Sequence, residues 1–112
     1  MTTANPPAVC LRIYLGEEKR EGDRPLYQVI IRQARQMHLA GATVLRGSQG
    51  YGRSARLHTA DVLFSEDLPV VIEIIDLAEK IDALVAILEK RKDIGLMTCQ
   101  PIELRGGRAF TE

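Results

Sequence analysis

The stretch from Gly47 to Arg53 holds the residues of this sequence that are best suited to bind an anion. It reads G-S-Q-G-Y-G-R and directly follows a strand-like run at 42–46. Glycines allow backbone N–H groups to approach a phosphate closely, and Arg46, Arg53 and Arg56 would supply positive charge. The pattern predicts a phosphate cradle, and turn formation alone remains the competing interpretation of its glycines.

This stretch matches neither of two well-known glycine-rich nucleotide motifs. Its glycines come in the reverse order of a Rossmann fingerprint, and no amphipathic helix with a trailing acidic residue follows. It also lacks the G-K-[ST] ending of a P-loop. An anion site here would therefore be of another kind.

Groups suited to catalysis or metal binding are scarce in the rest of the chain. His38 and His58 have no histidine, cysteine or carboxylate at metal-ligand spacing, and no serine stands in a G-x-S-x-G elbow. His38 stands at the end of a predicted helix and would support its C-terminus, whereas His58 could contact a ligand or be solvated. We expect a non-catalytic protein that requires no metal or cofactor.

Length and charge limit the possible classes of protein. At 112 residues the chain predicts a single domain, 1–112, with a core over about 9–104 and a loosely held tail at 105–112. Lys plus Arg and Asp plus Glu number 15 each, so we expect no nucleic-acid partner. No apolar run reaches the roughly 20 residues that span a bilayer, and the first residues lack a signal-peptide pattern. We therefore expect a cytoplasmic protein.

A few other polar or reactive residues are expected to have ordinary structural roles. Cys10 and Cys99 lack C-x-x-C spacing, and burial as small hydrophobic residues is favoured for both. Glu17 and Glu18 stand next to two basic residues, which predicts a solvated loop face.

Hydrophobic periodicity predicts the elements that position the glycine-rich stretch. The predicted strands are residues 9–15, 42–46, 68–75 and 96–103. The first helix is predicted from Pro25 to about Leu39, with Gly41 as its stop signal. The second helix would be capped by Asp76 and end near Arg91.

The order of these elements, βαββαβ, predicts an α+β fold of the ferredoxin-like type. The four predicted strands would form an antiparallel or mixed sheet with both helices on one face. Pro101 in the last strand suggests an edge position or a bulge. The long segment 47–67 would connect two strands, and segments of that length in small domains are usually functional or mobile.

The second face of the predicted sheet is more apolar than a solvated face usually is. The residues expected to share it are Cys10, Arg12, Tyr14, Val71, Glu73 and Ile75. We predict that other subunits cover it, which implies a homo-oligomer. Arg12 and Glu73 would either form a pair within this face or sit separately in water at its rim.

Five motifs spread along the chain form a pattern of their own. They are Leu11–Glu17 (LRIYLGE), Arg24–Tyr27 (RPLY), Gly41–Gly47 (GATVLRG), Gly50–Gly52 (GYG) and Leu68–Ile74 (LPVVIEI). Together they resemble the PII-like family known as domain of unknown function 190, over roughly residues 11–104.

The resemblance implies a fold, an assembly and a ligand. Members of the wider PII superfamily are ferredoxin-like trimers that bind adenine nucleotides in clefts between subunits, and a long loop docks on membrane transporters or enzymes. The residues that match the nucleotide-contacting pattern are Gly50, Tyr51, Gly52 and Arg53, with Gly95 in the place of a second, shorter loop. Arg46, Gly47 and His58 complete the set of predicted contacts.

Two departures from the PII pattern bear on the ligand. The segment 47–67 is shorter than the PII loop, and the second loop is reduced to residues 92–95. AMP or ADP is therefore at least as expected as ATP. Family members are often encoded with fluoride-channel proteins, which implies a membrane transporter or channel as the protein partner.

The functional hypothesis from the sequence is a regulatory homotrimer without catalysis. Binding of an adenine nucleotide (AMP, ADP or ATP) in the clefts would order the loop 47–67 for a protein partner. Two alternatives remain open: a small phosphohydrolase with a site at the subunit interface, and a divalent-metal-responsive trimer like the copper-tolerance proteins of the same fold.

Overall fold

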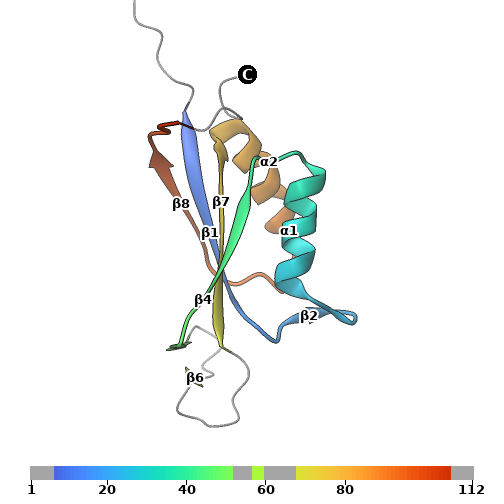
Figure 1. Cartoon of the computed structure of the whole chain (residues 1–112). Helices are drawn as coiled ribbons and strands as arrows, with labels where there is room; N and C mark the ends of the chain where they lie inside the picture. The colour runs from blue at the N-terminus through green and yellow to red at the C-terminus, as the bar shows by residue number, and fades with distance from the viewer. Residues whose placement is uncertain (1–6, 52–56, 60–67, 107–112) are drawn as a thin grey trace, which may run out of the picture.

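The structure is a computed structural model that describes residues 7–51, 57–59 and 68–106, with the backbone alone for residues 51 and 57–59 (Figure 1). Its elements are β1 (Ala8–Gly16), β2 (Arg20–Glu21), β3 (Arg24–Pro25), α1 (Leu26–Gln36), β4 (Ala42–Arg46), β5 (Gln49–Tyr51), β6 (Leu57–Thr59), β7 (Pro69–Leu77), α2 (Ala78–Leu88) and β8 (Met97–Ile102). The long elements follow the predicted order βαββαβ.

The main sheet has the strand order β4-β7-β1-β8, and every neighbouring pair is antiparallel. The central strands β1 and β7 pair from Ala8 opposite Leu77 to Gly16 opposite Pro69. Both helices lie on one face of the sheet (Figure 1). The predicted ferredoxin-like fold is confirmed, with a fully antiparallel sheet, and β8 with Pro101 is an edge strand as expected.

The core forms between this face and the helices because β1 and β7 alternate apolar side chains toward it. The buried residues that form it are Leu11, Ile13 and Leu15 of β1, Val70, Ile72 and Ile74 of β7, Leu26, Ile30 and Ala34 of α1, and Ile81, Leu84 and Leu88 of α2, together with Leu39. Within the described ranges, no helix is long and apolar enough to cross a membrane.

The first helix ends earlier than predicted, and a different residue stops it. α1 ends at Gln36, and His38 has a φ of 61°, the left-handed conformation that ends many helices. The His38 N–H donates to the carbonyl of Arg35, and the Leu39 N–H donates to that of Ala34, both at 3.0 Å. This is a Schellman motif, so the prediction of Gly41 as the stop signal was wrong.

The start of the second helix also differs from the prediction. α2 begins at Ala78 after Leu77, without a side-chain cap, so Asp76 does not cap it. Asp76 is buried, and its carboxylate accepts the Ala40 N–H at 2.9 Å and the Leu77 N–H at 2.6 Å. It therefore ties the connection after α1 to the end of β7. α2 ends at Leu88 rather than near Arg91.

The predicted loops contain short strands. β2 and β3 form a small hairpin ahead of α1, with Gly22 at a positive φ in its turn. β5 and β6 pair within the segment 47–67, where only irregular structure was expected. The two cysteines also differ: Cys10 is buried as predicted, but Cys99 is exposed, because β8 is an edge strand.

Candidate functional site

Most of the predicted ligand-contacting residues that the structure describes lie at one end of the main sheet. At this end β1 and β4 finish and β7 begins (Figure 1). Arg46 lies opposite Val70 in the register of β4 and β7, and Gly95 precedes the carbonyl of Leu96 that accepts the Tyr14 N–H at 3.0 Å. Segments far apart in the sequence thus meet here.

Arg46 and Gly95 nevertheless lie at opposite edges of this end. Arg46 ends β4, one edge strand, and Gly95 leads into β8, the other. Because neighbouring strands are about 4.8 Å apart, the two positions are separated by roughly 14 Å across β7 and β1. One copy of the chain does not bring these two predicted contacts together.

The guanidinium of Arg46 already has partners within the chain. Its Nε–H donates to Glu17 Oε1, its Nη2 donates to the Tyr27 hydroxyl at 3.2 Å, and its Cζ lies 5.7 Å from the centroid of the Tyr27 ring. The hydrogen bond and charge of Glu17 raise the pKa of Arg46 above its usual value. Glu17 lies in the loop after β1, as predicted, but its pairing with Arg46 was not foreseen, and an anion would compete with Glu17 for this arginine.

The glycines of the predicted cradle lie where the segment 47–67 leaves the sheet. Gly47 follows β4, and its N–H donates to the carbonyl of Pro69 at 2.8 Å. Gly50 lies in β5, opposite His58 in β6, and Tyr51 lies opposite Leu57. Gly52 and Arg53 fall outside the residues that the structure describes.

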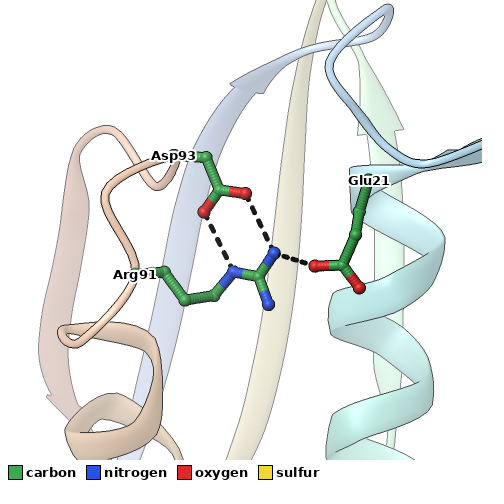
Figure 2. A network of polar contacts seen from close by, with 3 residues as sticks. All are labelled: Glu21, Arg91 and Asp93. Atoms are coloured by element: carbon green, nitrogen blue, oxygen red, sulfur yellow. Dashed lines mark hydrogen bonds and ion pairs between the residues drawn. The ribbon is translucent and has the colours of Figure 1, made fainter.

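Gly95 lies in the segment between α2 and β8, which Arg91 anchors by binding two carboxylates. Arg91 donates to both oxygens of Asp93, from Nε to Oδ1 and from Nη2 to Oδ2, each at 2.9 Å, and Nη2 also donates to Glu21 (Figure 2). These contacts hold the segment between α2 and β8 against the β2–β3 hairpin. Arg91 lowers the pKa of the Asp93 carboxyl, and its bonds with Asp93 and Glu21 raise its own pKa.

Sequence reasoning missed this network. Residues 92–95 were considered only as a reduced second loop, and Glu21 lies 70 positions from Arg91 in the sequence. The only usable signal was the short spacing of Arg91 and Asp93, two residues apart, because an arginine can fold back on a carboxylate at that distance.

The open face of the main sheet carries a polar pair, Arg12 and Glu73, which Thr98 of β8 and Thr43 of β4 flank in the register. Arg12 lies opposite Glu73, with Nε 3.0 Å from Glu73 Oε2, and its Nη1 donates to Gln100 Oε1 at 3.2 Å. The prediction of an Arg12–Glu73 pair is therefore confirmed. Tyr14 and Leu45 lie on this same face and are 38% and 50% exposed, so an apolar surface remains uncovered in the single chain.

Two hollows of the described chain lie away from the predicted contacts. One, of about 400 Å³, lies beside the start of β4 at the other end of the sheet, and Thr43, Glu73 and Arg105 are among its lining residues. Another, of about 340 Å³, lies between the β2–β3 hairpin and α1. In the described ranges, no group of three or more His, Cys, Asp or Glu residues is arranged to hold a metal ion.

Comparisons of the sequence with known proteins identify relatives over nearly the whole chain. A family model described as "Uncharacterized ACR" (DUF190) matches residues 8–104. A UPF0166 protein of Aquifex aeolicus (strain VF5) is 35% identical over 95 residues, which are 84% of this chain and 90% of that protein. A UPF0166 protein of Methanocaldococcus jannaschii is 32% identical over 105 residues, 92% of this chain and 96% of that one.

Solved structures with the same fold are more distant in sequence. A PII-like protein of Thermus thermophilus, described as a candidate signalling protein, has a TM-score of 0.66 at 12% identity and covers 94% of this chain and 96% of its own. CPII of Thiomonas intermedia K12, bound to ADP and bicarbonate, has a TM-score of 0.64 at 16% identity, with 88% of each chain covered. At these identities the likeness concerns the fold.

Proposed function

Because the chain belongs to the family of domain of unknown function 190, we propose that it is a PII-like regulatory protein that binds an adenine nucleotide between the subunits of a homotrimer. The nucleotide is AMP, ADP or ATP, and it acts as a ligand rather than as a cofactor. The protein works in the cytoplasm as a single domain and performs no catalysis. CPII, which has the same fold, is bound to ADP in one structure and to ADP and AMP in another.

One observation carries this proposal: the predicted contacts lie at the same end of the sheet but at opposite edges of it. Arg46 and Gly47 are on the β4 side, and Gly95 is on the β8 side. Neither of the two hollows described above joins them. A neighbouring copy whose β8 edge approaches the β4 edge of this one would bring both sets of residues to one ligand.

The uncovered sheet face supports the oligomer. Polar residues, including the Arg12–Glu73 pair, cross its centre, and Tyr14 and Leu45 are exposed toward one end of it. Apolar surface of this kind is commonly covered by another protein surface. Packing of these faces against each other around a threefold axis would bury them and create an identical cleft for each subunit.

Signalling would pass through the segment 47–67. A ligand that contacts Gly50, Tyr51, Gly52 and Arg53 would favour one arrangement of this segment over others, because it binds that arrangement more tightly. A protein partner, such as a membrane transporter or channel, would then recognise the arrangement rather than the nucleotide.

Calorimetric titration of the purified protein with AMP, ADP, ATP and cyclic nucleotides tests the proposal. We expect saturable binding of at least one of them, and weaker binding by Arg53→Ala. Arg35→Ala is the matched control, because Arg35 is an exposed arginine in the last turn of α1, away from the end of the sheet that carries Arg46 (Figure 1). The proposal fails if no nucleotide binds, or if Arg53→Ala binds as tightly as Arg35→Ala.

A further inference from the structure

Gly47 and Gly50 both pack against the ring of Pro69, the first residue of β7. A Cβ atom built on Gly47 would come within 2.9 Å of Pro69 Cγ, a distance that real Cβ atoms do not reach. A Cβ atom on Gly50 would come within 3.2 Å of the same atom. Each glycine therefore lies where any larger residue would push against the ring.

The need for glycine at these positions comes from space and not from backbone conformation. Among the described glycines, only Gly22 and Gly106 have a positive φ. Gly47 and Gly50 thus lie outside the left-handed region that favours glycine, and among the described residues the nearest atoms that a Cβ atom would meet belong to Pro69. Gly41 provides the contrast, because a Cβ atom there would meet nothing within 4 Å.

Backbone hydrogen bonds of Leu68 and Pro69 restrict movement of the Pro69 ring away from the two glycines. Its carbonyl accepts the Gly47 N–H at 2.8 Å, and the carbonyl of Leu68 accepts the Glu17 N–H at 2.8 Å. Pro69 also lies opposite Gly16 in the pairing of β1 and β7. The proline ring fixes its own φ, so the ring position is set by the sheet.

We propose that Gly47 and Gly50 are positioning residues that seat β5 on the ring of Pro69 and so fix the direction of the backbone as far as Tyr51, the last residue of β5. We call Gly47, Gly50 and Pro69 the proline seat. This inference rests on the proposed function, because residues 50–53 are its predicted nucleotide contacts. It assigns the two glycines a different role: they act through Pro69 rather than by letting the ligand approach their backbone.

Removal of the Pro69 Cγ atom would leave room for a side chain at Gly47 or Gly50. A Cβ atom on Gly47 would be 3.7 Å from Pro69 Cβ and 3.6 Å from its carbonyl oxygen, and one on Gly50 would be 3.6 Å from Pro69 Cβ. These are ordinary contacts, so Pro69→Ala should accommodate an added methyl group at either glycine. The proposal therefore predicts compensation between residues at the two ends of the segment 47–69.

Urea denaturation tests the seat without any ligand. We expect Gly47→Ala to lower the unfolding midpoint, Gly50→Ala to lower it less, and Gly41→Ala to leave it unchanged. In a Pro69→Ala background, Gly47→Ala should have a much smaller effect than in the wild-type background, as coupling between contacting residues requires. The proposal would be overturned if Gly47→Ala lowered the unfolding midpoint equally in both backgrounds, or if it left the midpoint unchanged as Gly41→Ala does.

Nucleotide titration of the same variants tests the positioning role. Gly47→Ala should weaken binding about threefold or more, and adding Pro69→Ala should recover part of the lost affinity. If Pro69→Ala restores the unfolding midpoint but not the affinity, Gly47 contacts the ligand directly and the positioning role is wrong. If the wild-type protein binds no nucleotide, the proposed function fails, and the urea experiment still decides whether the seat exists.

Discussion

The end of α1 and the end of β7 meet at a junction that two residues hold together. Asp76 is 3% exposed, and its Oδ2 accepts the Ala40 N–H at 2.9 Å. His38 turns the chain at a φ of 61°, and its carbonyl accepts a hydrogen bond from Lys80 Nζ at 2.9 Å. Because β4 begins directly after this junction, these contacts determine where the strand that ends in Arg46 enters the sheet.

Replacement of His38 tests the helix end. We expect His38→Gly to raise the free energy of unfolding by about 0.5–1 kcal/mol, because glycine adopts the left-handed conformation without a steric penalty. His38→Asn should give a smaller gain, and His38→Ala none, since alanine keeps the Cβ atom. Urea denaturation measures all three, and a His38→Gly variant no more stable than His38→Ala would contradict the assignment.

Replacement of Asp76 tests the junction from its other side. Asp76→Ala removes the buried carboxylate that accepts the Ala40 and Leu77 N–H groups in part-buried hydrogen bonds, so we expect a loss of about 1–3 kcal/mol in the free energy of unfolding. Asp76→Asn should lose less, because an amide oxygen can still accept one of the two hydrogen bonds. Chemical denaturation provides the comparison. If Asp76→Ala is as stable as the wild-type protein, the carboxylate does not hold the junction.

At the scale of elements, the connection between β1 and α1 contacts both segments that contain predicted ligand contacts. Glu17 binds Arg46, at the end of β4, and Glu21 binds Arg91, ahead of Gly95. Asp93 completes the second contact (Figure 2). Exposed ion pairs contribute little singly, but the two-point binding of Arg91 to Asp93 fixes the geometry of that segment.

The Asp93–Arg91 contact predicts a pH dependence of stability. The pKa of Asp93 is lowered in the folded protein, so its contribution is present above the unfolded-state value of about 3.9 and is lost as the pH falls through the folded-state value. Asp93→Asn should therefore be less stable than the wild-type protein near pH 7, and the difference should shrink on acidification.

Urea denaturation from about pH 2.5 to 7, a range that spans the titration of ordinary carboxylates, measures this dependence. The control is Asp82→Asn, because Asp82 is an exposed aspartate of α2 for which the described residues provide no ion pair. A stability difference between Asp93→Asn and the wild-type protein that does not change with pH would mean that the ion pair is not its cause.

The parts of the fold that follow from local pattern were predictable from the sequence. β1 and β7 alternate apolar residues, and the placement of Arg12 and Glu73 on one face follows from that alternation, although it does not specify which residues lie opposite each other. The end of α1 was not predictable, because a histidine replaces the usual glycine in its left-handed turn. The pairing of Glu17 with Arg46 depends on packing between distant segments, which no local pattern indicates.

At the scale of the whole molecule, the account requires that subunits cover the open sheet face. Leu45 is 50% exposed on this face, so we expect Leu45→Glu to place a charge in the interface and reduce the mass in solution from trimer toward monomer. Ile87→Glu is the matched control, because Ile87 is 38% exposed on α2, which covers the opposite face. Sedimentation velocity distinguishes the species.

Either of two results would contradict this requirement. A wild-type protein that sediments as a monomer has no such interface. A Leu45→Glu variant that keeps the wild-type mass shows that the interface lies elsewhere, in which case the cleft between the β4 and β8 edges loses its support.

The central claim is that two subunits share each nucleotide site, and mixing two defective variants tests it most directly. Arg53→Ala damages the segment 47–67, and Gly95→Val damages the opposite edge, where a Cβ atom would already lie 3.3 Å from the Tyr14 carbonyl oxygen. Each variant alone should bind nucleotide weakly.

After the two variants are unfolded and refolded together, a fraction of subunit pairs will join an intact segment 47–67 to an intact Gly95. Random mixing in a closed ring gives about one intact site in four. The account predicts that calorimetric titration of the mixture recovers high-affinity binding at about that stoichiometry. It is contradicted if native mass spectrometry detects mixed trimers and the mixture binds no better than the separate variants.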